Sequence, residues 1–274
     1  MNIISGKEIS DQIRSKLKET NAREGLQLCL AIMVVGDDKE NLIYIGLKEN
    51  AVAAMGGKTR IVSLPAQIEK QEILQQIAAL NQDEEVDGIL FQLPLPQNLQ
   101  VYQDEFLTAI DPRKDVDGFH PLNMGRLMSK NPGFVSCAAL ACMDVTKRFV
   151  EKLAGKKVLL VGDSFDLIKP LAMLFTQEAC QVTIAPAYKA AYMEGIDIAI
   201  IEKGAPLLVK ASGIKEGALI IDAGFYYEQT GLYGNVDKEA LTALKGHLLP
   251  VPGGMGPILI AKLLENLCQA VKKA

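Results

Sequence analysis

Hydrophobic and polar positions along the chain follow two periods, one typical of helices and one typical of buried strands. In residues 5–20, Ile9, Ile13 and Leu17 recur at four-residue steps, which predicts a helix with one apolar face. Residues 26–36 are nearly continuous in apolar side chains, as a strand buried on both faces requires. The alternation of strand and helix that follows, βαβαβα, predicts a parallel sheet with right-handed crossovers. The predicted strands are 26–36, 58–64 and 86–96, and the predicted helices that follow them are 40–55, 71–81 and 101–110.

The pattern restarts after a stretch rich in turn residues near positions 118–136. A helix, a strand and a second helix with Pro170 in its first turn are predicted next, followed by short strands and a long amphipathic final helix. We therefore predict an α/β fold of two units, the second a Rossmann-like domain with a parallel sheet. The final helix is expected to pack back on the first unit. The predicted domains are 1–133 with 255–274, and 134–254.

The amino-acid composition limits the kinds of protein to which this chain can belong. The 274 residues carry a net charge of −4, which offers no basic surface for nucleic acid or an anionic membrane. No apolar run is long enough to span a bilayer. The cysteines are an odd number and mostly lie in apolar runs, so we expect reduced core residues and a cytoplasmic protein. Two histidines without a Cys/His cluster give no basis for a metal site.

Two positions in the first predicted unit could carry chemistry. Tyr44 and Lys48 are four residues apart, so they share one face of a helix. A partly desolvated lysine beside a phenol can lose its charge near neutral pH and transfer protons, whereas a solvated lysine beside a half-buried tyrosine would have no such role. Gln92 lies near the carboxyl end of a buried strand, where ligands of α/β sheets bind. It could equally satisfy loop backbone.

Asp115 and Asp117 flank a valine just before a glycine turn. An aspartate in a turn commonly caps local backbone N–H groups. Alternatively, a carboxylate here could accept two parallel hydrogen bonds from a planar N–H/NH2 pair, such as pterins and guanines present. Spacing alone leaves both interpretations open.

Four motifs, in this order and at these intervals, carry a resemblance to a known family. They are "YIGLK" with Tyr44 and Lys48, "DGILFQLPLP" at 87–96, "KDVDGFHPLNMGRL" at 114–127, and "PVPGGMGP" at 250–257. Together they closely resemble the bifunctional methylenetetrahydrofolate dehydrogenase/methenyltetrahydrofolate cyclohydrolase family, and the resemblance covers nearly the whole chain. It implies an enzyme of one-carbon metabolism, a homodimer, with tetrahydrofolate derivatives bound in a cleft between two domains, NADP as cofactor and no metal.

The resemblance also implies roles for individual residues. Lys48 would be the catalytic base that promotes hydrolysis of the methenyl bridge, with Tyr44 and Gln92 holding the lysine and influencing its protonation. Asp117 would anchor the pterin edge of the substrate. A backbone turn would lie along the folate, and it consists of Val251, Pro252, Gly253 and Gly254.

One loop departs from the family pattern. Asp163, between Gly162 and Ser164, replaces the family's arginine that neutralises the 2′-phosphate of NADP, so it would repel that phosphate. Ile168 replaces a glycine that lets the backbone approach the pyrophosphate. Asp163 also lies too early in the sequence to accept the ribose 2′-hydroxyl of NAD.

Four further departures fall on the nucleotide side, while the folate-side residues remain. We therefore expect retained 5,10-methenyltetrahydrofolate cyclohydrolase activity, doubtful NADP binding, and weak or lost dehydrogenase activity. The alternatives are a fully bifunctional NAD(P)-dependent enzyme and a non-catalytic folate-binding regulatory paralogue. The departing segments are "APAYK" (185–189), Glu202-Lys203, Gly224-Phe225-Tyr226 and Ser136-Cys137-Ala138-Ala139.

Overall fold

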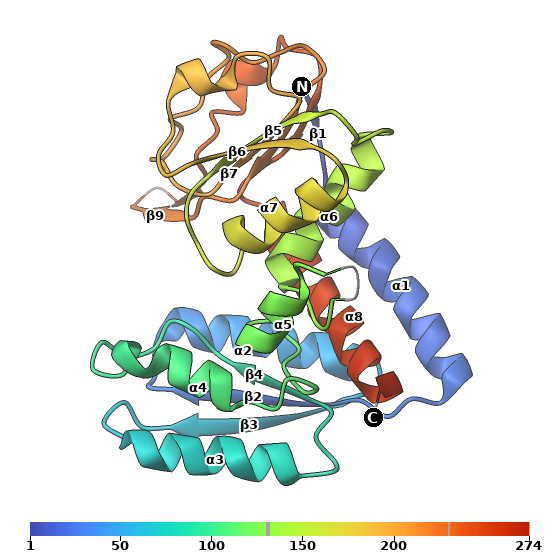
Figure 1. Ribbon diagram of the computed structural model, residues 1–274, viewed down its shortest axis with the longest axis vertical. Helices are drawn as coiled ribbons and strands as arrows, with labels where there is room; N and C mark the ends of the chain where they lie inside the picture. The colour runs from blue at the N-terminus through green and yellow to red at the C-terminus, as the bar shows by residue number, and fades with distance from the viewer. Residues whose placement is uncertain (130–131, 230, 274) are drawn as a thin grey trace. The chain divides into compact units, whose positions relative to one another are not determined.

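Strands and helices alternate in both halves of the chain, as the hydrophobic pattern predicts. The computed structural model describes residues 1–129, 132–229 and 231–273 (Figure 1). Its contacts divide the chain into two units. The three-stranded unit consists of Gln12–Cys137 with Ile260–Ala274, and the six-stranded unit consists of Met1–Asp11 with Ala138–Leu259. The first eleven residues thus join the second sheet, because the short strand β1 (Asn2–Ile3) pairs with a strand near the C-terminus.

The three-stranded unit has a parallel sheet in the order β3-β2-β4. Its central strand β2 is buried from Leu30 to Val35, in agreement with the continuous apolar run in the sequence. Strand β4 has four residues because a proline-rich turn follows, and proline has no N–H for a sheet. The elements are α1 (Gly6–Glu24) from Gln12 onward, β2 (Cys29–Val35), α2 (Lys39–Ala54), β3 (Lys58–Leu64), α3 (Lys70–Gln82), β4 (Gly88–Phe91), η1 (Gln100–Tyr102), α4 (Gln103–Ala109), α5 (Pro121–Arg126) and the end of α8 (Met255–Lys273).

The six-stranded unit has a parallel sheet in the order β1-β11-β8-β7-β5-β6. Some described strands are too short for hydrophobic periodicity to reveal. They are β9 and β10, which form a separate antiparallel pair, the edge strand β1 and its neighbour β11. The elements are α6 (Cys137–Phe149), β5 (Lys157–Val161), α7 (Ile168–Gln177), β6 (Gln181–Ala185), η2 (Ala190–Met193), β7 (Ile198–Ile201), β8 (Leu219–Asp222), β9 (Tyr226–Glu228), β10 (Gly231–Tyr233), η3 (Glu239–Leu241) and β11 (His247–Leu249).

Both sheets direct their carboxyl ends toward loops that hold predicted site residues. Gln92 directly follows β4, and its N–H donates to the carbonyl of Met33 in β2 at 2.8 Å. Gly162 directly follows β5, next to the end of β7, since Val161 pairs with Ile201. Parallel strands place such loops at one edge of the sheet, where α/β proteins bind ligands.

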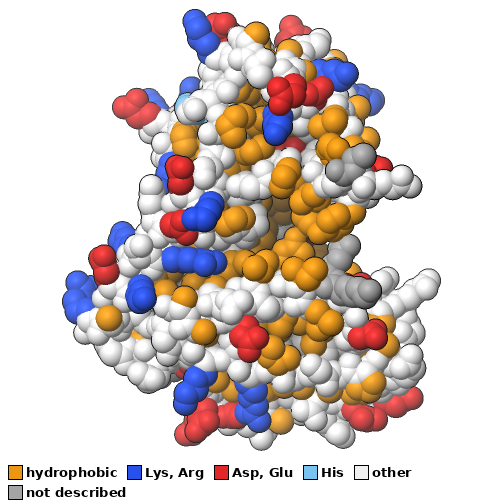
Figure 2. All heavy atoms as spheres, turned by 180° about the vertical axis from the view of Figure 1, so that it is seen from behind, with side chains coloured by type: hydrophobic (Ala, Val, Ile, Leu, Met, Phe, Trp, Pro, Cys, Tyr) orange, Lys and Arg blue, Asp and Glu red, His pale blue; other side chains and the backbone are white. Residues whose placement is uncertain are grey.

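Figure 2 shows acidic and basic side chains interspersed over the face that it draws. No described helix is both long and apolar enough to cross a bilayer. Phe91 in β4 is buried and meets Phe106 edge-on with ring centroids 5.6 Å apart.

Candidate functional site

A buried lysine and a glutamine form the centre of the candidate site in the three-stranded unit. Lys48 projects from α2 and is only 8% exposed, and Gln92, after β4, is equally buried. Lys48 Nζ donates to Gln92 Oε1 at 2.9 Å. Tyr44 lies half-buried one helical turn before Lys48. The structure therefore brings together the three residues predicted to be catalytic.

Burial controls the protonation of Lys48. Desolvation lowers the pKa of its ammonium group from the ordinary value, while the negative charge of Asp117 opposes that shift. A lysine in such a place can supply a neutral amine, which is able to accept a proton. The solvated-lysine interpretation of this pair is therefore wrong.

Asn41 is a site residue that the sequence analysis missed. It lies two helical turns before Lys48 on α2 and is buried, and its Oδ1 accepts from Gln92 Nε2 at 3.1 Å. The same Nε2 donates to the carbonyl of Leu93 at 2.7 Å. With both acceptors around the nitrogen, the amide can present only its oxygen to Lys48. The available signal was the spacing of Asn41, which puts it on the face of Tyr44 and Lys48.

The two turn aspartates have different environments. Asp115 is buried, and it accepts from the backbone N–H groups of Phe119 at 3.0 Å and His120 at 2.8 Å and from Asn123 Nδ2 at 2.8 Å. Burial raises the pKa of Asp115 to about 6 despite these bonds. Its contacts are those of a carboxylate that organises a turn.

Asp117 is the turn aspartate whose charge acts on Lys48. It is only partly buried, and its charge raises the pKa of Lys48. Burial raises the pKa of the Cys137 thiol, and the charge of Asp117 and a hydrogen bond with it raise that pKa further. Asp117 thus belongs to the same cluster as Lys48 and Gln92, within one unit.

The backbone turn of Val251, Pro252, Gly253 and Gly254 belongs to the six-stranded unit. Its conformation is fixed by close backbone contact with Gly6, whose N–H donates to the carbonyl of Gly253 at 3.0 Å. A Cβ on Gly6 would lie 1.8 Å from the Gly254 carbonyl oxygen, so only glycine fits there. The role of this turn toward folate stays a prediction.

The loop between β5 and α7 holds the predicted cofactor residues. Ser164 Oγ accepts from the N–H groups of Leu167 at 3.2 Å and Ile168 at 3.1 Å, and so caps α7. Ile168 is fully buried, and its Cγ1 lies 3.0 Å from where a Cβ on Gly162 would stand. Asp163 is exposed and forms an ion pair with Lys203.

Two acidic side chains lie at this loop. Glu202 Oε2 lies 2.1 Å from the position of a Cβ on Gly162, so a carboxylate occupies the space over the glycine. In a Rossmann-type loop that space belongs to the pyrophosphate. Asp163 adds a second acidic group on the same loop. No group of three or more His, Cys, Asp or Glu side chains among residues 1–129, 132–229 and 231–273 could hold a metal ion.

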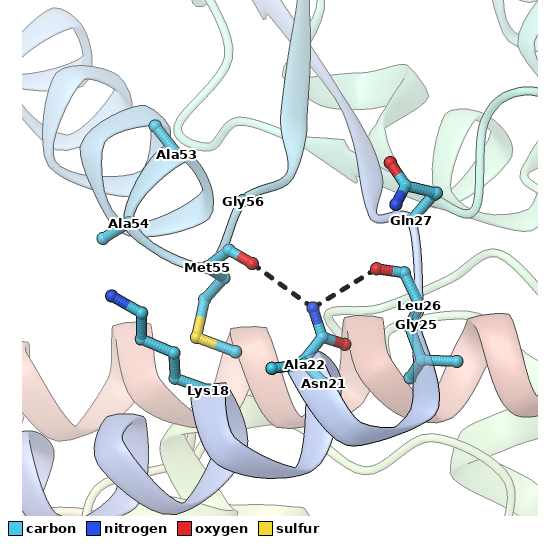
Figure 3. A pocket seen from close by; sticks show the side chains of 10 residues that line it. All are labelled: Lys18, Asn21, Ala22, Gly25, Leu26, Gln27, Ala53, Ala54, Met55 and Gly56. Carbon is cyan, nitrogen blue, oxygen red and sulfur yellow. Dashed lines mark hydrogen bonds between the residues drawn. The ribbon is translucent and has the colours of Figure 1, made fainter.

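A shallow pocket lies elsewhere on the three-stranded unit, at the ends of α1 and α2 (Figure 3). Its volume is about 480 Å³, and Asn21 Nδ2 donates across it to the carbonyls of Met55 at 3.3 Å and Leu26 at 3.5 Å. Of the ten lining residues labelled in Figure 3, only Lys18 is charged, and none is a predicted site residue.

Two domain models of one protein family match most of the chain. The catalytic domain of tetrahydrofolate dehydrogenase/cyclohydrolase matches residues 4–117, and the NAD(P)-binding domain of the same family matches residues 136–274. Bifunctional protein FolD 1 of Syntrophomonas wolfei subsp. wolfei is 56% identical over 275 residues, which cover 100% of this chain and 99% of the relative.

Solved structures show the same similarity over the whole length. The bifunctional FolD enzyme, a methylenetetrahydrofolate dehydrogenase/cyclohydrolase, of Campylobacter jejuni has a TM-score of 0.93 and 34% identity, covering 100% of this chain and 99% of that one. FolD from Trypanosoma brucei, solved with NADP and an inhibitor, has a TM-score of 0.91 and 30% identity, covering 99% and 97%. The chain therefore belongs to the tetrahydrofolate dehydrogenase/cyclohydrolase family of folate one-carbon enzymes.

Proposed function

We propose that the chain is a cyclohydrolase that converts 5,10-methenyltetrahydrofolate to 10-formyltetrahydrofolate, with Lys48 as its base. The observation that carries this proposal is a desolvated amine, held at 2.9 Å on an amide oxygen whose orientation is fixed. Family membership supplies the substrate. In this proposal the three-stranded unit carries the catalytic residues, and the six-stranded unit is the nucleotide-type domain.

The chemistry requires one base beside the methenyl carbon. Water adds to this amidinium carbon, and Lys48, as a neutral amine, takes one proton from the water. The other water proton passes to N5 as the bond between the carbon and N5 breaks, which leaves a formyl group on N10. Lys48 then releases its proton to solvent, so the reaction yields one proton. A cationic substrate near Lys48 also favours the neutral amine.

The other site residues position the lysine and the substrate. Gln92 Oε1 accepts from the Lys48 amine and so directs it, and Tyr44 borders the lysine on α2. Asp117 is proposed to bind the pterin edge through two parallel hydrogen bonds, and the Val251–Gly254 turn to lie along the folate. Asp115 has no place in this proposal, because its carboxylate is engaged by its own turn.

The proposal includes a weak or lost dehydrogenase activity. Asp163 on the β5–α7 loop carries the wrong charge for the 2′-phosphate of NADP, and Glu202 lies over Gly162. Both substitutions act against binding of a dinucleotide phosphate.

The second candidate is a fully bifunctional enzyme that binds NADP or NAD through altered contacts. It is favoured by the match of residues 136–274 to the family's NAD(P)-binding domain and by the relatives, which are named bifunctional. A homodimer, expected from the resemblance, and a cytoplasmic location, expected from the cysteines, are part of both candidates. Strand β6 at the edge of its sheet, with Ile184 half exposed, is compatible with pairing to a second copy.

Replacing Lys48 by methionine should abolish catalysis. Methionine fills a similar volume without a base, so we expect loss of at least about 100-fold in the rate of methenyltetrahydrofolate hydrolysis. The rate is read from the fall of the substrate's absorbance in a non-nucleophilic buffer. Lys58→Met, at an exposed lysine of the same unit, should retain the parent rate. A Lys48→Met variant as fast as the parent, or a parent no faster than buffer, would refute the assignment.

Replacing Asn41 by leucine should shift the pH profile of the same reaction. Without Asn41 Oδ1 the Gln92 amide can turn its nitrogen toward Lys48, and the ammonium form loses an acceptor. The pKa of Lys48 then falls, so the rate should level off at a lower pH and at a plateau about tenfold lower, because a weaker base transfers protons less effectively. Asn50→Leu, on an exposed position of α2, is the control. A profile identical to the parent's would show that Asn41 has no positioning role.

A dehydrogenase assay separates the two candidates. With 5,10-methylenetetrahydrofolate and either NADP⁺ or NAD⁺, we expect no growth of reduced-cofactor or methenyl absorbance above a protein-free blank. A bifunctional relative serves as positive control. Steady growth with either nucleotide would establish the bifunctional enzyme instead.

A further inference from the structure

Glu202 enters the β5–α7 loop from the neighbouring strand. It directly follows β7, and its N–H donates to the carbonyl of Val161 at the end of β5, at 2.9 Å. Because β5 and β7 are adjacent parallel strands, residues just past their ends share one edge of the sheet. The side chain of Glu202 therefore starts beside Gly162.

The Glu202 carboxyl group lies against the open face of Gly162. A Cβ on Gly162 would stand 2.1 Å from Glu202 Oε2 and 3.1 Å from Glu202 Cβ. Gly162 also has φ of +143°, a conformation that disfavours other residues. Because Gly162 has no side chain, another group can come close to its backbone. In this chain that group is the Glu202 carboxylate.

The oxygen of Glu202 nearest Gly162 is buried. This oxygen, Oε2, has no hydrogen-bond partner among the described residues, and burial raises the pKa of the Glu202 carboxyl group. Backbone N–H groups at the start of a helix after a glycine loop are the donors that bind phosphate in dinucleotide-binding folds. Here a carboxyl group of the same chain takes the space beside that glycine.

A separate network fixes the backbone of Glu202. Asn235 Nδ2 donates to the carbonyls of Ile201 at 2.9 Å and Glu202 at 3.3 Å. Tyr226 donates its hydroxyl to Asn235 Oδ1 at 3.0 Å and accepts from the N–H of Gly204 at 3.0 Å. The backbone of the segment that carries Glu202 is therefore held in place by the side chains of Asn235 and Tyr226.

We propose that the Glu202 carboxylate occupies the anion site of the β5–α7 loop and acts as an intramolecular competitor of dinucleotide phosphates. Asp163 adds a second acidic group on the same loop, although it is paired with Lys203 from the segment after β7. This inference rests on the weak nucleotide binding in the proposed function. It concerns binding alone and not hydrolysis of the methenyl bridge, which Lys48 variants test separately.

The test measures NADP⁺ and NAD⁺ binding by isothermal titration calorimetry in an Asp163→Asn background, which removes the repulsion of Asp163 in every sample. Adding Glu202→Ala should lower the Kd of at least one nucleotide tenfold or more, because the space over Gly162 opens. Glu202→Gln keeps the volume but removes the charge, and should give a smaller gain. Glu194→Ala, at an exposed acid of the same unit, should give none.

Two results would overturn the proposal. One is a double variant Asp163→Asn/Glu202→Ala that binds both nucleotides no better than Asp163→Asn alone. The other is a parent protein that binds either nucleotide with a Kd that Glu202→Ala leaves unchanged. Thermal unfolding of each variant shows that the comparison is made on folded protein.

Discussion

The desolvation of one amine is the constraint on which the candidate site depends. An ammonium group buried to the extent of Lys48 is unfavourable unless its charge is balanced, and the neighbouring acidic charge of Asp117 balances it only in part. The pKa of Lys48 is therefore lowered, and the amine still has a fixed acceptor in Gln92. The surroundings follow from this need: Asn41 fixes the amide of Gln92, and Asp115 shapes the turn that carries Asp117.

The two units use the same architectural position in opposite ways. In each, a loop after a parallel strand presents polar groups at the carboxyl edge of a sheet. In the three-stranded unit those groups surround a reactive amine. In the six-stranded unit the Glu202 carboxyl group takes the space beside the corresponding loop, and Asp163 of that loop pairs with Lys203. Membership of a family with an NAD(P)-binding domain thus fixes the fold of this unit, while the side chains at the loop decide its affinity for nucleotide.

The elements and residues that could be predicted from the sequence are those indicated by neighbouring positions in the chain. The apolar run of β2 and the order of strands and helices in each unit are confirmed, because burial of one or both faces dictates their periodicity. The Tyr44–Lys48 spacing likewise predicted a shared helix face. Strands of two or three residues, such as β1 and β11, carry too few positions for a period to show.

Contacts between distant segments could not be predicted in the same way. The sequence indicated that Glu202-Lys203 departs from the family pattern, but only the pairing of β5 with β7 brings the Glu202 carboxyl group to Gly162. Asn41 was missed for the same reason, since its role depends on Gln92, which lies 51 positions further along the chain. The separate environments of Asp115 and Asp117 also depend on which carboxylate the turn encloses, and spacing does not reveal that.

The pH dependence of methenyltetrahydrofolate hydrolysis tests the central claim most directly. The spontaneous rate at each pH is subtracted, and the residual rate is followed from neutral pH upward. If a neutral Lys48 amine is the base, the residual rate should rise with pH and level off at an ionisation below the ordinary lysine pKa of about 10.4. A residual rate that is flat across this range, or that falls as pH rises, would contradict the account.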